Sequence, residues 1–373
     1  MIIPFGFLRK AAGGAPPNLP STYVLSELDI VSGRDAAGVQ FPQLTKIDDT
    51  HFIECYNSSA TNKQTVKIWA IEGGLLVEKD ALVLDAFYGS RDSGVVLMDS
   101  THFAVAWNGN TLDGWIGTIS FNPTTYVMTA EHLFEHDIVF AEWNSLVKID
   151  ANHVALAYSG TGNDGFLKVF TFDGSWQITL ETTLEHDPVL GNFNSFQQID
   201  ATHYALAYNG GAADGYLKVF SLDTGTWVFT QVGSTYTFTT TATYIHLRRI
   251  TDLEWLVVVS WESQDGAAWV IEIDGSYAMT TISSKEWLTT NTIPSACVVD
   301  DNHYLIGYAS TQEPSEQGRV AVMYLHPTTR AHSTLQTFIQ GTGINGVHHD
   351  IIQLTPTKYV VASSQVLQYL DLA

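Results

Sequence analysis

Basic residues are scarce in this chain. Its 373 residues include 17 lysines and arginines against 39 aspartates and glutamates, which gives a formal net charge of −22. Phosphate binding needs clustered Lys and Arg, so the composition argues against a nucleic-acid groove. The surplus of acidic residues favours a well-solvated surface suited to saline surroundings over a dedicated metal site.

Cysteine and long apolar runs are also rare. Cys55 and Cys297 stand in segments that we expect to lie too far apart for a disulfide bond. No uninterrupted apolar stretch is long enough to span a bilayer, so we predict no membrane insertion. At the N-terminus a short, proline-broken apolar run precedes Arg9 and Lys10, and this order is the reverse of a secretory signal.

Familiar catalytic motifs are missing as well. The chain has no serine-centred catalytic elbow, phosphate-cradling glycine loop, HExxH zinc motif or CxxC pair. Two carboxylates from different loops can still meet in a folded chain, although no pair stands out. We therefore predict a non-enzymatic protein without a cofactor.

What the sequence does contain is a repeated Asp-x-x-His motif. It recurs about every 50 residues, a period typical of repeat architectures. One interval between two copies of the motif is twice that length and contains a sixth copy at residues 251–255. A seventh copy, at residues 355–359, has lost both the Asp and the His. We interpret the motif as structural, because the Asp can cap its own turn and the imidazole can satisfy nearby backbone groups. The five intact copies end at His51, His102, His153, His203 and His303.

Each repeat has the pattern of β-strands. After a first strand, the repeat that begins at Asn144 has apolar runs at 154–158, 166–172 and 177–184, with no helical period. Asp173-Gly174 between two of these runs is a strong hairpin signal. Four antiparallel strands repeated seven times predict an all-β, seven-bladed β-propeller over residues 22–373.

The two ends of the chain complete this interpretation. The seventh repeat supplies only three strands, at 350–354, 359–362 and 366–372, and the run at 22–31 has the character of a fourth. We expect this N-terminal strand to complete the last blade and leave no unpaired edge. Residues 1–21 are then a flexible arm, which either folds back on the propeller or docks into a partner through its apolar residues. Those residues are Ile2, Ile3, Phe5, Phe7 and Leu8.

Aromatic residues recur five positions after the histidine of the motif, and small polar residues follow them. Rings beside Asn and Ser are the ingredients of a glycan-binding surface, where a sugar face stacks and its hydroxyls form hydrogen bonds. The alternative is that the rings pack between neighbouring blades. The candidate glycan-binding residues are Tyr56, Trp107, Asn108, Tyr158, Tyr208, Asn209, Trp261 and Tyr308.

Three segments between repeats place carboxylates beside imidazoles. Such residues can bind a divalent ion, but alternation along a strand prevents one triplet from converging, so ligands would have to come from several blades. We expect hydrogen-bonded loop residues and predict no metal. The triplets are Glu135-His136-Asp137, Glu185-His186-Asp187 and His348-His349-Asp350.

The repeats resemble seven-bladed β-propellers but lack the WD-repeat, kelch and Asp-box signatures. The opening MIIPFGFLRK at residues 1–10 resembles the starts of tail and appendage proteins of tailed bacteriophages. This resemblance implies a virion protein whose arm binds other virion proteins and whose propeller contacts a host surface glycan or another virion protein. One alternative is a soluble or secreted, extracellular lectin. The other is a polysaccharide hydrolase or lyase that uses Glu135, His136, Glu185 and His186.

Overall fold

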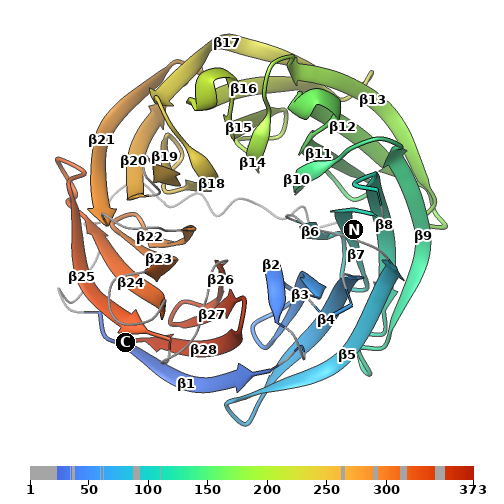
Figure 1. Ribbon diagram of the computed structural model, residues 1–373, viewed down its shortest axis with the longest axis horizontal. Helices are drawn as coiled ribbons and strands as arrows, with labels where there is room; N and C mark the ends of the chain where they lie inside the picture. The colour runs from blue at the N-terminus through green and yellow to red at the C-terminus, as the bar shows by residue number, and fades with distance from the viewer. Residues whose placement is uncertain are drawn as a thin grey trace, which may run out of the picture.

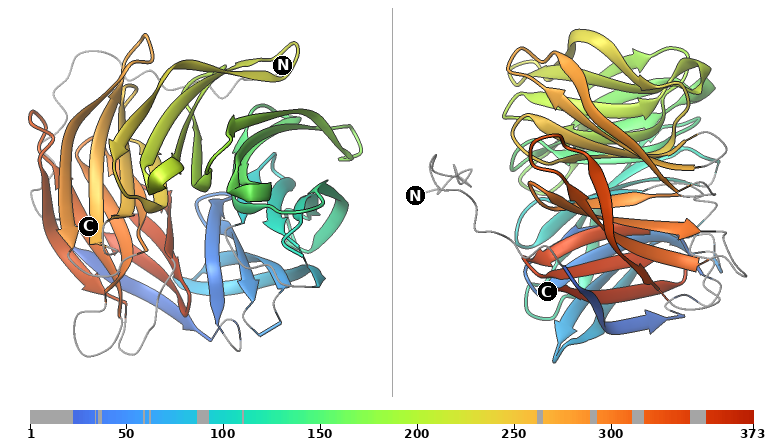
Figure 2. Two further views of the ribbon diagram at one scale, coloured as in Figure 1. Left: turned by 45° about the horizontal axis from the view of Figure 1, so that its top comes forward. Right: turned by 90° about the vertical axis from the view of Figure 1, so that its left-hand side faces the viewer.

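In a computed structural model of the chain, seven four-stranded antiparallel sheets stand around a central channel (Figure 1). Seen from the side, the ring is a flattened disc (Figure 2). The structure describes residues 23–33, 35, 38–58, 60–61, 63–86, 93–109, 111–261, 265–288, 293–310, 317–340 and 349–373. The predicted all-β, seven-bladed propeller is therefore confirmed.

Blades 1 to 6 take their strands in chain order from the channel outwards (Figure 1). Blade 1 contains β2 (Val39–Lys46), β3 (His51–Ser58), β4 (Lys63–Glu72) and β5 (Leu75–Ala86). Blade 2 contains β6 (Gly94–Leu97), β7 (His102–Asn108), β8 (Gly114–Phe121) and β9 (Met128–Asp137). Blade 3 contains β10 (Glu142–Lys148), β11 (His153–Ser159), β12 (Gly165–Phe172) and β13 (Ile178–Asp187), with the 3-10 turn η1 (Thr161–Asn163).

The next three blades follow the same plan. Blade 4 contains β14 (Asn192–Gln198), β15 (His203–Asn209), β16 (Gly215–Asp223) and β17 (Val228–Thr239), with the 3-10 turn η2 (Gly211–Ala213). Blade 5 contains β18 (Thr243–Arg249), β19 (Glu254–Trp261), β20 (Asp265–Ile273) and β21 (Met279–Leu288). Blade 6 contains β22 (Ser295–Asp300), β23 (His303–Ser310), β24 (Gln317–Leu325) and β25 (His332–Ile339).

The last sheet joins strands from both ends of the described chain. Blade 7 contains β26 (His349–Thr355), β27 (Lys358–Ser363) and β28 (Val366–Leu372), and β1 (Leu25–Ser32) pairs antiparallel with β28. The backbone groups of Val24 and Ala373 exchange hydrogen bonds of 2.9 and 3.1 Å. β1 therefore lies at the outside of this blade, where β5, β9 and the other fourth strands lie in theirs (Figure 1).

The core lies between neighbouring blades. Ile53, Cys55 and Val66 of blade 1, for example, pack in one cluster with Phe103 and Trp107 of blade 2. Because a blade is covered on both faces, its second strand is buried almost continuously, whereas outer strands such as β13 alternate mainly between half-buried and exposed residues. This burial explains the short, wholly apolar runs of the sequence.

Both cysteines are free, as the sequence predicted, and both are buried. Burial raises the pKa of each thiol to about 12, so neither thiolate forms readily. Among the described residues, no helix is long and apolar enough to cross a membrane.

The Asp-x-x-His motif forms a turn that also contacts the next blade. Asp200 accepts backbone N–H bonds of 2.9 Å from both Thr202 and His203, and its carboxylate lies 2.9 Å from the imidazole Nδ1. The imidazole stacks at 4.2 Å on Tyr277 of blade 5, whose hydroxyl donates to Asp200 at 3.0 Å. We call this contact the inter-blade latch. The same stacking joins His51 to Tyr126, His102 to Trp176 and His153 to Trp227, and His303 meets Tyr23 edge-on.

The latch changes its chemistry where the motif is broken. Glu254 of blade 5 replaces the histidine, and Arg330 of blade 6 stands where the other blades have the aromatic residue. Arg330 has the same left-handed backbone as Tyr277, with φ of 53° and 62°, and donates to Glu254 at 2.8 Å. The two departures therefore match each other across the seam.

Candidate functional site

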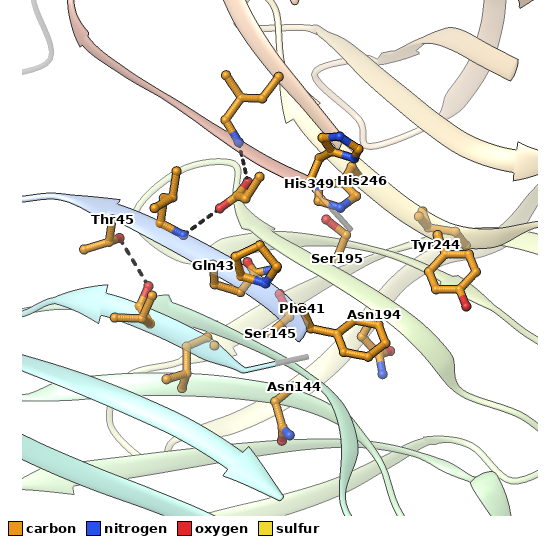
Figure 3. A pocket seen from close by; sticks show the side chains of 18 of the residues that line it. Phe41, Gln43, Thr45, Asn144, Ser145, Asn194, Ser195, Tyr244, His246 and His349 are labelled. Atoms are coloured by element: carbon orange, nitrogen blue, oxygen red, sulfur yellow. Dashed lines mark hydrogen bonds between the residues drawn. The ribbon is translucent and has the colours of Figure 1, made fainter. Parts of the chain in front are cut away.

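A cavity of about 310 Å³ lies inside the ring of innermost strands. This volume is at the lower end of the range for small-molecule sites. Its walls come mainly from β2, β6, β10, β14, β18 and β26. The residues labelled in Figure 3 belong to five of these strands and line the cavity.

Four inner strands begin with a β-bulge. The pairing register shifts between Gln40 and Gln43 in β2, and equivalent shifts occur in β10, β14 and β18. Each bulge contains one aromatic residue with left-handed φ, a conformation that costs about 1–3 kcal/mol for a non-glycine residue. Bulges redirect side chains, and here they direct rings inwards. These residues are Phe41 (49°), Trp143 (57°), Phe193 (54°) and Tyr244 (50°).

The four rings meet, although they come from blades 1, 3, 4 and 5. Ring centroids lie 4.0 Å apart for Trp143 and Phe193, 4.8 Å for Phe193 and Tyr244, and 6.0 Å for Phe41 and Trp143. We call Phe41, Trp143, Phe193 and Tyr244 the channel aromatic cluster. Three of its members line the cavity directly, and Trp143 packs against them.

Small polar side chains follow the aromatic residues and connect the inner strands. The hydroxyl of Ser145 accepts from the backbone N–H of Phe196 in the next blade at 3.0 Å, and Ser195 accepts from Leu247 at 2.9 Å. Asn194 donates from its amide nitrogen to the carbonyl of Gly191 at 2.8 Å. Its amide oxygen is buried and has no hydrogen-bond partner among the described residues.

One ion pair crosses the cavity wall from blade 5 to blade 7. Nη2 of Arg248 lies 3.7 Å from Oδ1 of Asp350. Asp350 as a residue is 3% exposed. Asp350 also accepts backbone N–H bonds from Leu44 at 2.7 Å and Ile351 at 2.9 Å. Burial raises the pKa of this carboxyl, while Arg248 and the two N–H groups oppose the rise. Arg248 is itself held by its bond from Nε to the carbonyl of Ala296 at 3.0 Å.

His246 lies two residues before Arg248 on β18. Burial, followed by the positive charge of Arg248, holds the pKa of His246 well below its usual value, so the ring is neutral. Its Nδ1 lies 3.3 Å from Nη2 of Arg248. Because arginine can only donate, Nδ1 accepts, and the proton of the neutral ring is on Nε2.

The predicted glycan-binding residues lie elsewhere. Seven of them are at most 4% exposed, and Trp261 packs against the core cluster between blades 4 and 5. Tyr208 donates to Asp187 at 2.8 Å, and Asn209 donates to the carbonyl of Ala242 at 2.7 Å. Buried rings offer no face to a sugar, so the structure favours the alternative, packing between blades. The seven buried residues are Tyr56, Trp107, Asn108, Tyr158, Tyr208, Asn209 and Tyr308.

The acidic and histidine triplets separate as the alternation along a strand requires. Glu135 is exposed, His136 is buried, and Asp137 accepts from Tyr158 at 3.0 Å. No group of three or more His, Cys, Asp or Glu side chains is arranged to hold a metal ion within the described part of the chain. His348 and the arm residues Ile2, Ile3, Phe5, Phe7 and Leu8 lie outside the described residues.

None of the predicted glycan-binding residues lines the cavity, whereas His349 and Asp350 of the third acidic and histidine triplet do. One signal was present in the sequence: the triplets Trp143-Asn144-Ser145 and Phe193-Asn194-Ser195 repeat an aromatic–Asn–Ser order. Their inward direction depends on the bulge, which a strand pattern does not reveal.

No protein-family model matches the chain, and no curated protein matches it. Among solved structures, it resembles a Bacteroides fragilis protein described as a "putative 6-phosphogluconolactonase", with a TM-score of 0.60 and 12% identity over 87% of this chain and 88% of that one. A Bacteroides uniformis protein with the same description has a TM-score of 0.60 and 12% identity over 82% and 86%. Saccharomyces cerevisiae Sqt1 has a TM-score of 0.53 and 9% identity over 93% and 98%.

These comparisons correct the function expected from the sequence. The interpretation as a phage virion module that contacts a host glycan or another virion protein is wrong, because the two Bacteroides proteins carry the description of an enzyme and none of the three is a phage tail protein. The lectin and polysaccharide-cleaving alternatives gain no support from them either. At 12% identity or less, the likeness itself shows the shared propeller fold alone.

Proposed function

We propose that the protein binds a small molecule in its central channel. One observation carries the proposal: four aromatic residues with left-handed backbone, from four blades, converge beside a cavity that also contains His246, Arg248 and Asp350. Strained backbone that recurs at one site persists only where the surrounding structure holds it, and such strain gathers at ligand sites.

The cavity wall combines polar and apolar side chains. Gln197, His246 and Arg248 from blades 4 and 5 supply polar groups, whereas Val96 and Ile352 from blades 2 and 7 supply apolar surface. A wall that combines polar groups with apolar surface can both bury a ligand and set its orientation.

The test is to fill the cavity. Gln197→Trp places a large ring among the lining residues, and we expect small ligands found by ligand-observed NMR screening to lose about tenfold or more in affinity. Gln231→Trp, on an exposed position of β17, is the matched control and should bind as the unmodified protein does. Ligands that bind equally well to both variants would contradict a channel site.

A second candidate function is hydrolysis of a lactone or ester in the same cavity. Two observations favour it: the description of the two Bacteroides proteins, and the N–H donor at Nε2 of His246 in the cavity wall, which is suited to polarising a carbonyl. Water would add to the carbonyl carbon, the C–O bond of the ring would break, and the proton of the water would pass to the released alkoxide. Release of acid from D-glucono-1,5-lactone above the spontaneous rate, lost in His246→Leu, would support it; an unchanged rate would refute it.

A further inference from the structure

An open recess of about 590 Å³ lies at the seam between blades 5 and 6. Its wall contains the turn of blade 5 at residues 251–254 and two residues of the blade 6 hairpin, Pro327 and Thr328. At four other seams an aromatic ring of the inter-blade latch packs on the histidine at this position. Arg330 stands here instead, and its guanidinium reaches Glu254 at 2.8 Å. The recess is thus located where the latch has no ring.

The wall of the recess carries a surplus of negative charge. Glu254 and Glu272 lie directly opposite each other on β19 and β20, and like charges in this position repel. Arg330 pairs with Glu254, and Arg249 pairs with Asp252 at 2.9 Å. Glu272 has no ion-pair partner among the described residues, so one carboxylate of the recess lacks a counter-charge.

This pair of opposed carboxylates is specific to blade 5. In the five blades with an intact Asp-x-x-His motif, the residue opposite the histidine on the third strand is uncharged. Those residues are Ala70, Ser120, Thr171, Ser221 and Tyr324. The acidic recess is therefore a departure from the repeat, and function is commonly added to a scaffold at such local departures.

Apolar side chains complete the wall. Leu253 of blade 5 is 44% exposed, Ile282 of the same blade is 37% exposed, and Pro327 lines the recess from blade 6. A cluster of exposed apolar side chains is typical of a surface that binds another segment of chain. The recess therefore suits a segment that combines apolar residues with a cation.

The first described residue of the chain contacts blade 6, which forms part of this wall. The ring of Tyr23 meets His303 of blade 6 edge-on at 4.5 Å, and its hydroxyl donates to Asp300 at 3.0 Å. Tyr23 therefore supplies a latch ring at the seam between blades 6 and 7 from outside the repeats. The arm thus joins the propeller on the face that carries the latch turns, one seam away from the recess.

The sequence of the arm matches the recess in charge and polarity. Residues 1–22 contain Arg9 and Lys10 but no Asp or Glu, in a chain whose formal net charge is −22. The apolar residues of the arm come directly before these two cations, at positions 2–8. The 12 residues between Lys10 and Tyr23 can span about 40 Å when extended. The first and fourth strands of a blade lie only about 15 Å apart, so the arm is long enough to reach the recess.

We propose that residues 1–10 bind in this recess of the same molecule, with a basic side chain beside Glu272 and the apolar residues against Leu253 and Ile282. Tethering favours this contact over one with another copy, because a short linker gives an effective concentration in the millimolar range. The inference is independent of the proposed channel site. It makes the seam with the altered latch the place where the arm is held.

Limited digestion of the full chain with trypsin tests the contact. Trypsin cleaves after Arg9 and Lys10, and cleavage follows the fraction of molecules in which these residues are released. The protection factor is the cleavage rate in a synthetic peptide of residues 1–14 divided by the rate at the same bonds in the protein, both measured by mass spectrometry. We expect a factor of about ten or more for the unmodified protein.

Charge variants locate the position of the cation. Glu272→Lys places a cation opposite Glu254, which suits the strand pair but repels the arm, so the protection factor should fall about tenfold. Glu286→Lys changes the net charge equally at an exposed position of β21 outside the recess, and it should leave the factor unchanged.

An apolar variant tests the other half of the contact. Leu253→Ser removes exposed apolar surface from the recess and should lower the protection factor by about threefold or more. Leu75→Ser, at an exposed position of blade 1, is the matched control and should leave the factor unchanged. Because Leu253 is exposed, this variant keeps its fold and provides the test even if Glu272→Lys does not fold.

Four outcomes would overturn the inference. A protection factor near one in the unmodified protein would show that the arm is not bound. A factor that neither Glu272→Lys nor Leu253→Ser lowers would place the arm elsewhere. Equal losses in Glu272→Lys and Glu286→Lys would indicate general attraction to an acidic surface. Protection that disappears on hundredfold dilution of the protein would assign the arm to another copy.

Discussion

Arg330 of blade 6 donates to Glu254 of blade 5 at 2.8 Å. At the equivalent contact, four other pairs of neighbouring blades stack an imidazole on an aromatic ring. Both residues depart from the repeat, and each departure makes sense only in the presence of the other. The Arg330 side chain is 7% exposed, so its charge needs a partner. Blades 5 and 6 therefore preserve the contact while changing its chemistry from stacking to ion pairing.

This relationship predicts non-additive stability effects. Glu254→His leaves Arg330 buried beside an imidazole, and we expect the free energy of unfolding to fall by about 2 kcal/mol. Arg330→Tyr alone leaves Glu254 without its cation and should also destabilise. The double variant Glu254→His/Arg330→Tyr recreates the latch of the other blades and should recover most of the loss in urea unfolding. A double variant as unstable as the sum of the two single ones would show that the residues are not coupled.

The Asp-x-x-His turns predict a specific acid sensitivity. Burial alone raises the pKa of Asp200, but hydrogen bonds from Thr202, His203 and Tyr277 outweigh it and lower the pKa from 3.8 to about 2. A carboxyl whose pKa is depressed on folding adds stability that is present above its unfolded pKa and is lost as the pH falls through the folded value. This contribution should therefore disappear between about pH 4 and pH 2.

Asp200→Asn tests that contribution, because it keeps an oxygen for the backbone N–H groups and removes the charge. Measured by urea unfolding, the variant should be less stable than the unmodified protein at pH 6 and should lose less stability between pH 4 and pH 2. Asp49→Asn, at an exposed carboxylate, is the control and should follow the unmodified protein. Parallel pH curves for Asp200→Asn and the unmodified protein would rule out this role of the carboxylate.

The sequence predicted the blades well because their main determinants are local. Turn residues and short apolar runs recur with a constant period, and each reports a strand or hairpin without knowledge of its neighbours. The glycan-binding prediction failed to gain support for a related reason. An aromatic residue such as Tyr158 or Tyr208 recurs in five of the blades because the same kind of gap between blades must be filled each time.

The polar residues of the channel site come from blades that depart from the repeat. His246 and Arg248 come from blade 5 and Asp350 from blade 7, the two blades in which the Asp-x-x-His motif is lost. Their convergence across blade 6 is set by ring closure, and the direction of the aromatic rings is set by bulges. Neither can be derived from the strand pattern of a single repeat.

The thiols predict a simple reactivity result. Cys55 and Cys297 are buried, and burial raises both pKa values to about 12. Because the thiolate is the reactive form, an aromatic disulfide reagent should modify neither residue in the native protein at pH 8 and should modify both after unfolding in urea. Rapid reaction of either thiol in the folded state would show that the inter-blade core opens locally.

The left-handed backbone of the channel aromatic cluster predicts that substitution by glycine is less destabilising than substitution by alanine, the reverse of the usual order in a strand. Phe193→Ala and Phe193→Gly both remove the ring and its contacts with Trp143 and Tyr244, so their difference reports the backbone alone. Within an ordinary strand, glycine is less stable than alanine by roughly 0.5–1 kcal/mol. At φ of 54° the alanine retains the strain and the glycine does not, so we expect Phe193→Gly to be the more stable variant by about 1 kcal/mol in urea unfolding.

The matched control is Phe196, three residues further along β14 and fully buried. Phe196 is not among the described residues with positive φ, so Phe196→Ala should be more stable than Phe196→Gly, the usual order. The same order at Phe193 would mean that its backbone relaxes once the ring is gone, and the bulge would then be a consequence of ring packing. An inverted order at Phe193 alone would show that the inner strand imposes the bulge and thereby directs the ring into the channel.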